Sequence, residues 1–250
     1  MLVMKSYRGS ISHNLYVPSS DPDHIDDVDL FEVYIAPVDY YIGIEPAPQS
    51  KRSFQKIEGV YDTAGYELLH FVRMCINCNP NIITSLFLNK EHYIETSAYW
   101  EELLKVREVF LSKFMYNTFS GYAKQERIRM EKSITGEKKY LGYMGEKRKE
   151  LVTRYGYDTK NACNVVRLIT MAIETLTTGK MNVCRHHDRE ELLAIKQGKV
   201  TMKDVLTKIK ELEDKLLVAG KCNLLPEKPD TDLINKTVIG IMRNYISNRE

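Results

Sequence analysis

The sequence predicts an α+β protein, with a small α/β unit that holds a short mixed sheet, followed by a mostly helical C-terminal region. Two observations predict this class. In the first 62 residues the apolar runs are short, β-branched and aromatic, as in strands. From Thr63 onward, apolar residues recur at helical spacing. We expect residues 1–90 to form the α/β core and residues 91–250 a helical domain.

The N-terminal pattern predicts three strands separated by turns. Ser10 is placed to cap a short helix, and Pro37 stands at a first helical position before VDYYIGI. The expected strands cover residues 2–7, 27–36 and 56–61.

The remaining sequence predicts a series of helices. The first contains Leu68, Leu69, Val72, Cys75 and Ile76 on one stripe, and Asn79-Pro80 ends it. The later helices are expected near 82–88, 97–113, 119–133, 138–154, 159–178, 188–196, 201–219 and 230–247.

Composition excludes several classes of protein. The 250 residues carry a net charge of +2, which argues against a protein that coats nucleic acid through general basicity. No apolar run approaches the roughly 18 residues of a membrane-spanning helix. An odd count of five cysteines, with no apolar signal-peptide core in MLVMKSYRGS, predicts free thiols in a reducing cytoplasm.

Charge is distributed unevenly along the chain. Residues 1–62 contain five Lys/Arg and ten Asp/Glu, whereas residues 113–160 contain twelve Lys/Arg and six Asp/Glu. An acidic N-terminal unit facing a basic central segment suggests a site between them. Two solvated faces of opposite sign are the alternative interpretation.

Two carboxylates are predicted to share one strand face. Asp27 and Asp29 lie two residues apart at the start of an expected strand, so both side chains project together. Such a pair persists most readily beside a divalent cation, and hard oxygen ligands favour Mg²⁺, with Mn²⁺ as the alternative. Asp62 is the first candidate for a third carboxylate and Glu58 the second. A solvated strand edge is the simpler explanation.

A phosphate-binding turn is predicted upstream of this pair. Gly9 lets the backbone approach a ligand, and Ser10 with the free N–H groups of a helix start can hold a phosphate. A phosphate cradle before a metal-binding pair is the layout for a nucleoside triphosphate bound through Mg²⁺.

These residues resemble a known family. GSISHN at 9–14 with DVD at 27–29 resembles the signature of the DNA polymerase beta nucleotidyltransferase superfamily. EVYIAPVDYYIGI at 32–44 resembles its RNA-ligase-associated branch. Further matches to that branch are YEL at 66–68 with NPN at 79–81, FSGYAKQ at 119–125, YGYDTKNA at 155–162 with VRL at 166–168, and TGK at 178–180.

The resemblance implies a polymerase-beta-like fold and transfer of a nucleoside monophosphate from a triphosphate, with release of pyrophosphate. It implies that Gly9 and Ser10 hold the β- and γ-phosphates and that Asp27 and Asp29 bind metal. Asp62, just before TAGYELL, takes the third metal-binding position and orients or deprotonates the attacking hydroxyl. His13 lies in the same turn and is a candidate phosphate contact.

Two positions depart from the family pattern. Asn14 stands where most superfamily members have glycine, so the turn is expected to differ. Asn164 stands where the branch usually carries a histidine, which points to altered or slower catalysis. All three acidic residues are present, so we expect an active enzyme.

The basic segment supplies further candidates for nucleotide binding. Lys124, Lys160 and Arg167 lie inside the matching motifs and are suited to neutralising triphosphate charge, and Tyr122 is placed to stack on a base. Arg127, Lys138 and Lys139 are weaker candidates. Surface cations and a helix-packing aromatic are the alternative interpretations.

Two cysteine motifs are set aside. Cys75 and Cys78 lie near the end of an amphipathic helix without a second pair, so core thiols are expected. Cys184-Arg-His186-His187-Asp188 resembles part of a zinc site but lacks a spaced partner pair, so a loop is expected.

The sequence therefore predicts a metal-dependent nucleotidyltransferase that acts on a hydroxyl of an RNA end, a small molecule or a protein. A nucleotide-binding regulatory or interaction module with little turnover is the alternative. The base preference and the oligomeric state are not predicted.

Overall fold

The computed structural model describes residues 1–18, 26–42, 52–134 and 146–248. The chain divides into two compact units. The first contains Met1–Tyr16, Asp26–Ser112 and Pro226–Glu250, and the second contains Val17–Ile25 and Lys113–Leu225. The first unit extends to Ser112, beyond the expected boundary at residue 90. It also includes the C-terminal segment.

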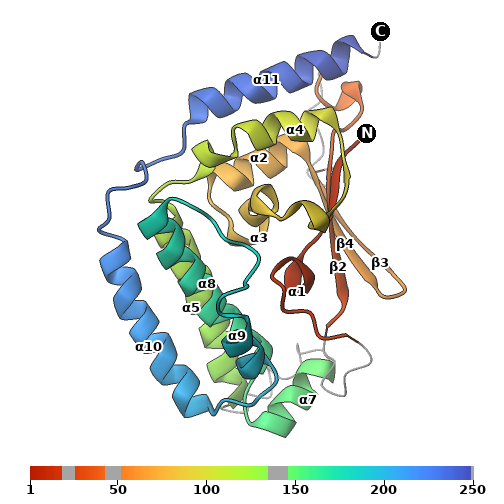
Figure 1. Ribbon diagram of the computed structural model, residues 1–250. Helices are drawn as coiled ribbons and strands as arrows, with labels where there is room; N and C mark the ends of the chain where they lie inside the picture. The colour runs from red at the N-terminus through yellow and green to blue at the C-terminus, as the bar shows by residue number, and fades with distance from the viewer. Residues whose placement is uncertain (19–25, 43–51, 135–145, 249–250) are drawn as a thin grey trace. The chain divides into compact units, whose positions relative to one another are not determined.

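A five-stranded mixed sheet organises the first unit, as the α+β prediction required (Figure 1). The strand order is β3-β4-β2-β1-β5. β2 and β4 run parallel, whereas β1 pairs antiparallel with β2 and β5, and β3 pairs antiparallel with β4. The strands are β1 (Leu2–Tyr7), β2 (Val28–Tyr34), β3 (Ser53–Glu58), β4 (Tyr61–Glu67) and β5 (Tyr93–Thr96).

The stretch from Thr63 to Glu67 corrects one expectation. The sequence placed it in a helix, but it forms most of β4. Gly65 leaves room for the ring of Phe54 on the neighbouring strand, which a side chain at this position would overlap. The helix begins only at Leu68, where the Glu67 carboxylate accepts hydrogen bonds from the backbone N–H groups of Leu69 and His70. Pairing with neighbouring strands thus overrides a local helical pattern.

Helices pack on this sheet through an aromatic core. Phe31 of β2 lies 6.1 Å from Phe71, and Phe71 lies 5.6 Å from the buried Trp100, between ring centroids. These rings join the sheet to two different helices. The elements of the first unit are α1 (Gly9–Ser12), α2 (Leu68–Ile76), α3 (Pro80–Ile83), α4 (Ala98–Lys105) and α11 (Thr231–Ser247), with 3₁₀ turns at Val38–Tyr40, Thr84–Phe87, Lys90–His92 and Arg107–Phe110.

The C-terminal helix α11 belongs to the first unit. Its predicted apolar stripe is confirmed, because Ile234, Val238, Ile241 and Tyr245 are buried. The helix packs against α4, and the Tyr245 hydroxyl donates a 3.0 Å hydrogen bond to the backbone carbonyl of Ala36. The last segment of the chain therefore supports the segment that follows β2.

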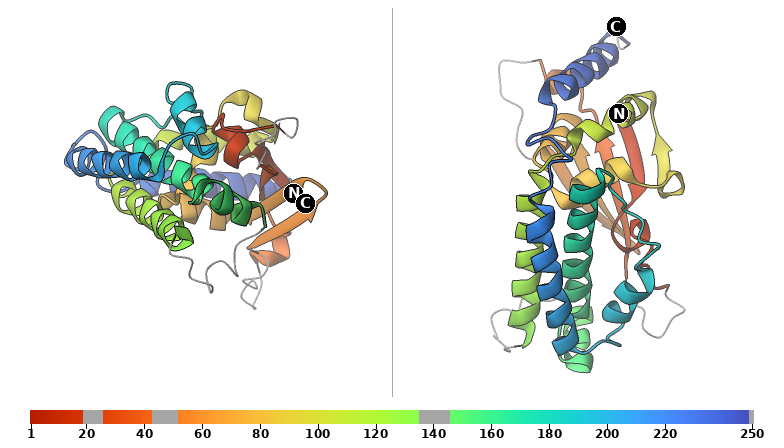
Figure 2. Two further views of the ribbon diagram at one scale, coloured as in Figure 1. Left: turned by 90° about the horizontal axis from the view of Figure 1, so that it is seen from below. Right: turned by 60° about the vertical axis from the view of Figure 1, so that its left-hand side comes forward.

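Long helices make up the second unit (Figure 2). α8 lies at its centre and packs against α5, α9 and α10. Asp158 caps α8 by accepting from the backbone N–H of Asn161 at 2.9 Å, and Gly179 ends the helix with a φ of 70°. The helices are α5 (Met115–Ile134), α7 (Glu146–Tyr155), α8 (Thr159–Thr178), α9 (Arg189–Lys196) and α10 (Met202–Ala219).

Within the described residues, the helices are too short or too polar to cross a lipid bilayer.

The hydrogen bond between Tyr245 of α11 and the backbone carbonyl of Ala36 generates a stability prediction. Tyr245→Phe removes the buried hydroxyl and leaves the Ala36 carbonyl without this donor, so the free energy of unfolding should fall by about 1 kcal/mol. Urea denaturation measures this change. Tyr99→Phe on α4, where the side chain is half-buried, is the matched control and should change little. Equal stability of both variants would contradict a role for this hydrogen bond.

Candidate active site

Two of the three predicted carboxylates lie on neighbouring strands of the first unit, and the third directly precedes one of these strands. Asp29 of β2 is the direct register partner of Asp62 of β4 in the parallel pair. Paired residues on adjacent strands project from the same face of a sheet. Asp27 lies two residues before Asp29, immediately ahead of β2. The fold therefore brings two of the three predicted acids directly beside each other and places the third next to them in the chain.

Glu58, the second candidate for the third acid, lies elsewhere. It is exposed on the edge strand β3 and forms a 2.6 Å ion pair with Lys56. Its register partner is Tyr61. The register with Asp29 favours Asp62.

Gln55 is a residue of the site that the sequence analysis missed. Its side-chain Nε2 donates to both carboxylate oxygens of Asp62, at 3.0 Å and 3.1 Å. A neutral amide thus holds Asp62 in place and leaves its negative charge uncompensated by this contact. No motif pointed to Gln55, since only the hairpin pairing of β3 with β4 brings it there.

The predicted phosphate-binding turn lies against the acidic pair. Gly9 has a φ of 61°, the left-handed conformation that glycine favours, and a side chain there would overlap the Asp29 carboxylate. The backbone N–H of Arg8 donates to the Asp29 carbonyl at 3.0 Å. Glycine at position 9 is therefore required by both backbone conformation and space.

Ser10 and Asp26 form a second unexpected contact. The Ser10 hydroxyl donates a 2.9 Å hydrogen bond to the Asp26 carboxylate, which is buried. Asp26 therefore ties the turn to the start of β2. His13 is also buried, and its backbone N–H donates to the Gly9 carbonyl at 3.2 Å.

Asn14 has a backbone conformation that glycine also favours. Its φ is 60°, in the left-handed region where asparagine is tolerated far better than most other residues. The departure from glycine is thus compatible with the same kind of turn. Asn164, the other departure, is half-buried on α8 of the second unit.

The four predicted nucleotide-binding residues of the basic segment lie in the second unit. Lys124 lines a cavity of about 460 Å³ together with Ser120 and Arg127 of α5 and Glu213 of α10. Arg127 forms ion pairs with Glu131 and Glu213 in this cavity, which fits the structural interpretation of that residue. Tyr122 is half-buried on α5, and Lys160 lies in the first turn of α8. Lys138 and Lys139 lie outside the described residues.

Arg167 differs from these surface cations. It is buried on α8, and its guanidinium donates to the Met171 sulfur at 3.4 Å. Burial lowers the pKa of Arg167 to about 10. Among the described residues, Arg167 forms no ion pair with a carboxylate, although Glu126 and Asp188 act on it at longer range. A buried cation without a close counter-ion is a candidate for binding an anion.

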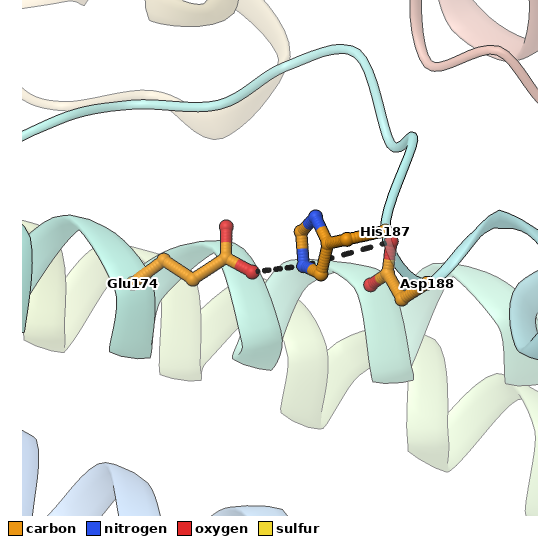
Figure 3. Close-up of side chains that lie close together, drawn as sticks. All are labelled: Glu174, His187 and Asp188. Atoms are coloured by element: carbon orange, nitrogen blue, oxygen red, sulfur yellow. Dashed lines mark hydrogen bonds and ion pairs between the residues drawn. The ribbon is translucent and has the colours of Figure 1, made fainter.

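A second group of potential metal ligands is better explained as an ion-pair network. Glu174, His187 and Asp188 lie close together in the second unit (Figure 3). The buried Arg185 donates to both Glu174 oxygens at 2.7 Å and to Asp188 at 2.7 and 3.0 Å. Burial lowers the pKa of Arg185, but hydrogen bonds to these two carboxylates outweigh it and raise the pKa overall. Arg185 thus already supplies the positive charge that a metal would bring.

The two cysteine motifs lie in different surroundings. The five cysteines, all among the described residues, form no disulfide. Cys75 and Cys78 are buried, and burial raises the pKa of the Cys78 thiol to about 11. Cys184 contacts His186 at 3.2 Å, but neither belongs to the group around Arg185.

Comparison with known proteins gives the family. The family model described as "RNA repair pathway DNA polymerase beta family" matches residues 17–239. The chain belongs to this family. The match covers the acidic strands and the helical motifs, and it begins after the Gly9-Ser10 turn, so the evidence for that turn is the geometry described above.

Other comparisons add little. No curated protein matches the chain. Among solved structures, a nucleotidyltransferase-like protein from Exiguobacterium sibiricum is 11% identical, with 97% of this chain and 74% of that chain covered. The TM-score is 0.31, which is too low to support an argument about fold or function.

The packing of Gly9 against Asp29 generates a prediction. Gly9→Ala introduces a side chain where the Asp29 carboxylate lies and forces alanine into a left-handed conformation, so the unfolding free energy should fall by about 1 kcal/mol or more. Thermal denaturation measures this. Gly121→Ala is the control, since open space surrounds that position on α5 and alanine favours helix. An unchanged Gly9→Ala variant would contradict the close packing of the turn.

Proposed function

We propose that this protein is a metal-dependent nucleotidyltransferase that moves a nucleoside monophosphate from a triphosphate to a hydroxyl acceptor. Membership of a polymerase beta family supports nucleotidyl transfer in general. The observation that carries the specific proposal is the register pairing of Asp29 with Asp62 beside the Gly9 turn. The family description names an RNA repair pathway, which favours an RNA end as the acceptor.

The acidic residues offer the type of ligand that a divalent cation prefers. Asp29 and Asp62 are paired on one sheet face, and the partner identified for Asp62 is the neutral amide of Gln55. Like charges this close repel each other, and hard oxygen ligands are those that Mg²⁺ and Mn²⁺ prefer. Asp27, Asp29 and Asp62 would hold the cation, which supplies charge neutralisation for the phosphates.

The turn at Gly9 would hold the triphosphate. Its left-handed glycine allows the backbone to come close to the β- and γ-phosphates. The Ser10 hydroxyl donates to Asp26 and is therefore fixed in position before a nucleotide arrives. Asp26 and His13 support the turn from its buried side.

In the proposed step, the acceptor hydroxyl oxygen forms a bond to the α-phosphorus. The bond from that phosphorus to the bridging oxygen breaks, and pyrophosphate leaves with the electron pair. Asp62 accepts the proton of the hydroxyl, and Gln55 keeps its carboxylate oriented. The product is the nucleotidylated acceptor.

The second unit would contribute charge and stacking. Arg167 is the strongest candidate there, because a bound phosphate would provide the counter-ion that its buried guanidinium lacks. Lys124, Lys160 and Tyr122 are proposed as further nucleotide contacts.

Asp62→Asn tests the proposed function directly. The amide keeps the shape of the side chain but cannot accept the proton, so pyrophosphate release should fall by roughly 10²-fold or more. Triphosphate binding, measured by calorimetry, should persist. Full pyrophosphate release by this variant would remove Asp62 from the mechanism. If wild-type protein binds triphosphate and releases no pyrophosphate with any acceptor, a regulatory binding module becomes the better interpretation.

Gln55→Leu tests the positioning of Asp62. Loss of both hydrogen bonds frees the carboxylate, so we expect pyrophosphate release to fall by about tenfold. Gln55→Asn keeps the amide on a side chain that is one methylene shorter, so the amide reaches Asp62 less well. We expect its rate to lie between those of wild type and Gln55→Leu. Rates that match wild type in both variants would show that the contact has no catalytic importance.

The Arg167→Met variant tests whether Arg167 binds the triphosphate or only stabilises the fold. Removing a buried charge without a close counter-ion should leave the free energy of unfolding unchanged or raise it by about 1 kcal/mol. Triphosphate affinity should fall by about tenfold, because a charge-assisted contact is lost. Destabilisation with unchanged affinity would instead make Arg167 a structural residue.

A further inference from the structure

The strand β3 forms one edge of the described sheet (Figure 1). All six of its residues are exposed, and they include two large apolar side chains, Phe54 at 40% and Ile57 at 73% exposure. The strand contains no proline, and its register with β4 runs from Ser53 to Glu58 without a bulge. Prolines and bulges are among the devices that protect an edge strand from pairing with another chain. β3 therefore has the properties of a strand that can accept a partner.

The hydrogen bonds of this hairpin show which backbone groups of β3 point away from β4. The Arg52 carbonyl accepts a hydrogen bond from the backbone N–H of Glu67 at 2.9 Å, so the backbone of Arg52 faces β4. In an antiparallel pair, residues that face the partner strand alternate with residues that do not. The N–H and C=O groups of Ser53, Gln55 and Ile57 therefore point to the outer edge. Within the described sheet, no further strand lies beyond this edge to pair with them.

The outer edge of β3 is complementary to itself in one antiparallel register. When Gln55 lies opposite the partner's Gln55, Ser53 lies opposite the partner's Ile57, and every outward N–H and C=O group gains a hydrogen-bond partner. In the same register, Arg52 lies opposite the partner's Glu58, which makes a favourable cross-strand charge pair. The two-fold symmetry repeats each of these contacts, as an interface between identical copies requires.

The charge of Lys56 is compatible with this register, although lysine on an edge strand commonly deters pairing. Its ammonium group forms a 2.6 Å ion pair with Glu58 of the same strand. In the paired arrangement, Lys56 lies opposite the partner's Phe54, and the face of an aromatic ring attracts a cation. The charges along β3 therefore favour this register.

We infer that β3 pairs with β3 of a second copy of this chain and joins the two sheets into one. The two-fold axis of such an antiparallel pair stands perpendicular to the sheet, so both acidic faces point to the same side. Gln55, which donates to Asp62, lies at the symmetry axis and would stand next to the partner's Gln55. The two candidate active sites would thus border each other across the interface.

A second copy is the occupant that the sequence of β3 favours. An identical strand supplies the matching charge at both ends of the strip, where Arg52 and Glu58 lie. Pairing of β3 with the opposite sheet edge, β5, would leave further edges open and build a chain of molecules instead of a closed dimer. A strip of this length buries less surface than the roughly 1,600 Å² of a standard interface, so we expect a weak dimer.

Sedimentation of the full chain at up to about 100 μM tests this pairing. Wild-type protein should form a concentration-dependent dimer. Arg52→Glu and Glu58→Arg each place like charges opposite one another at both ends of the strip, so each variant alone should dimerise at least about tenfold more weakly. An equimolar mixture of the two variants restores opposite charges at both ends and should regain the dimer. Glu95→Arg reverses an exposed charge on β5 and is the matched control, which should dimerise like wild type.

Ile57→Pro tests the backbone hydrogen bonds independently of charge. Proline removes an N–H group that points away from β4, which an edge strand tolerates, so the fold should persist by circular dichroism while the dimer is lost. A wild-type monomer at about 100 μM, a dimer unaffected by Arg52→Glu, or a mixture that stays monomeric would overturn the inference. Loss of the dimer in Glu95→Arg alone would also overturn it, because the interface would then involve β5. These measurements need neither nucleotide nor metal, so their outcome is independent of the proposed transfer.

Discussion

The parallel pairing of β2 with β4 is the constraint on which the candidate site depends. It sets Asp29 directly beside Asp62, although 33 residues separate them in the sequence. A slip of one residue would turn Asp62 to the opposite face and bring Tyr61 or Thr63 beside the acid. Every other feature of the site, including Gln55 and the Gly9 turn, is arranged around this pair.

This arrangement places like charges together at the expense of stability. Two unit charges about 4 Å apart repel each other by about 1 kcal/mol in water, and by more near a protein surface. Because Gln55 is neutral, its hydrogen bonds to Asp62 do not cancel this repulsion. In the turn, the backbone at Gly9 has a left-handed conformation, close to Asp29, that glycine accommodates much better than other residues. Natural sequences accept such local conflicts mostly where a ligand resolves them. The second unit shows the same kind of conflict at Arg167, whose buried charge lacks a close counter-ion among the described residues.

The sequence predicted the chemistry of the site better than its geometry. Asp27 and Asp29 were found because period-two alternation places both on one face. Asp62 was chosen first as an acid expected beside the strand of Asp29, and the family pattern then placed it just before a helix. It lies inside β4, because strand pairing overrides the helical signal of TAGYELL. Gln55 and Asp26 were not predicted as site residues. Each acts through a contact with a residue of another strand or turn, and such contacts produce no local sequence pattern. The helices α8, α9, α10 and α11 were predicted well, since their apolar stripes are regular.

Transfer of label from an α-labelled nucleoside triphosphate tests the central claim most directly. The protein is incubated with Mg²⁺ and a short RNA, alongside an Asp27→Asn, Asp29→Asn double variant. Our account predicts that wild-type protein transfers label to the RNA and releases pyrophosphate, and that the double variant does neither. Triphosphate binding by wild-type protein without transfer of label to RNA, protein or any small acceptor would contradict it.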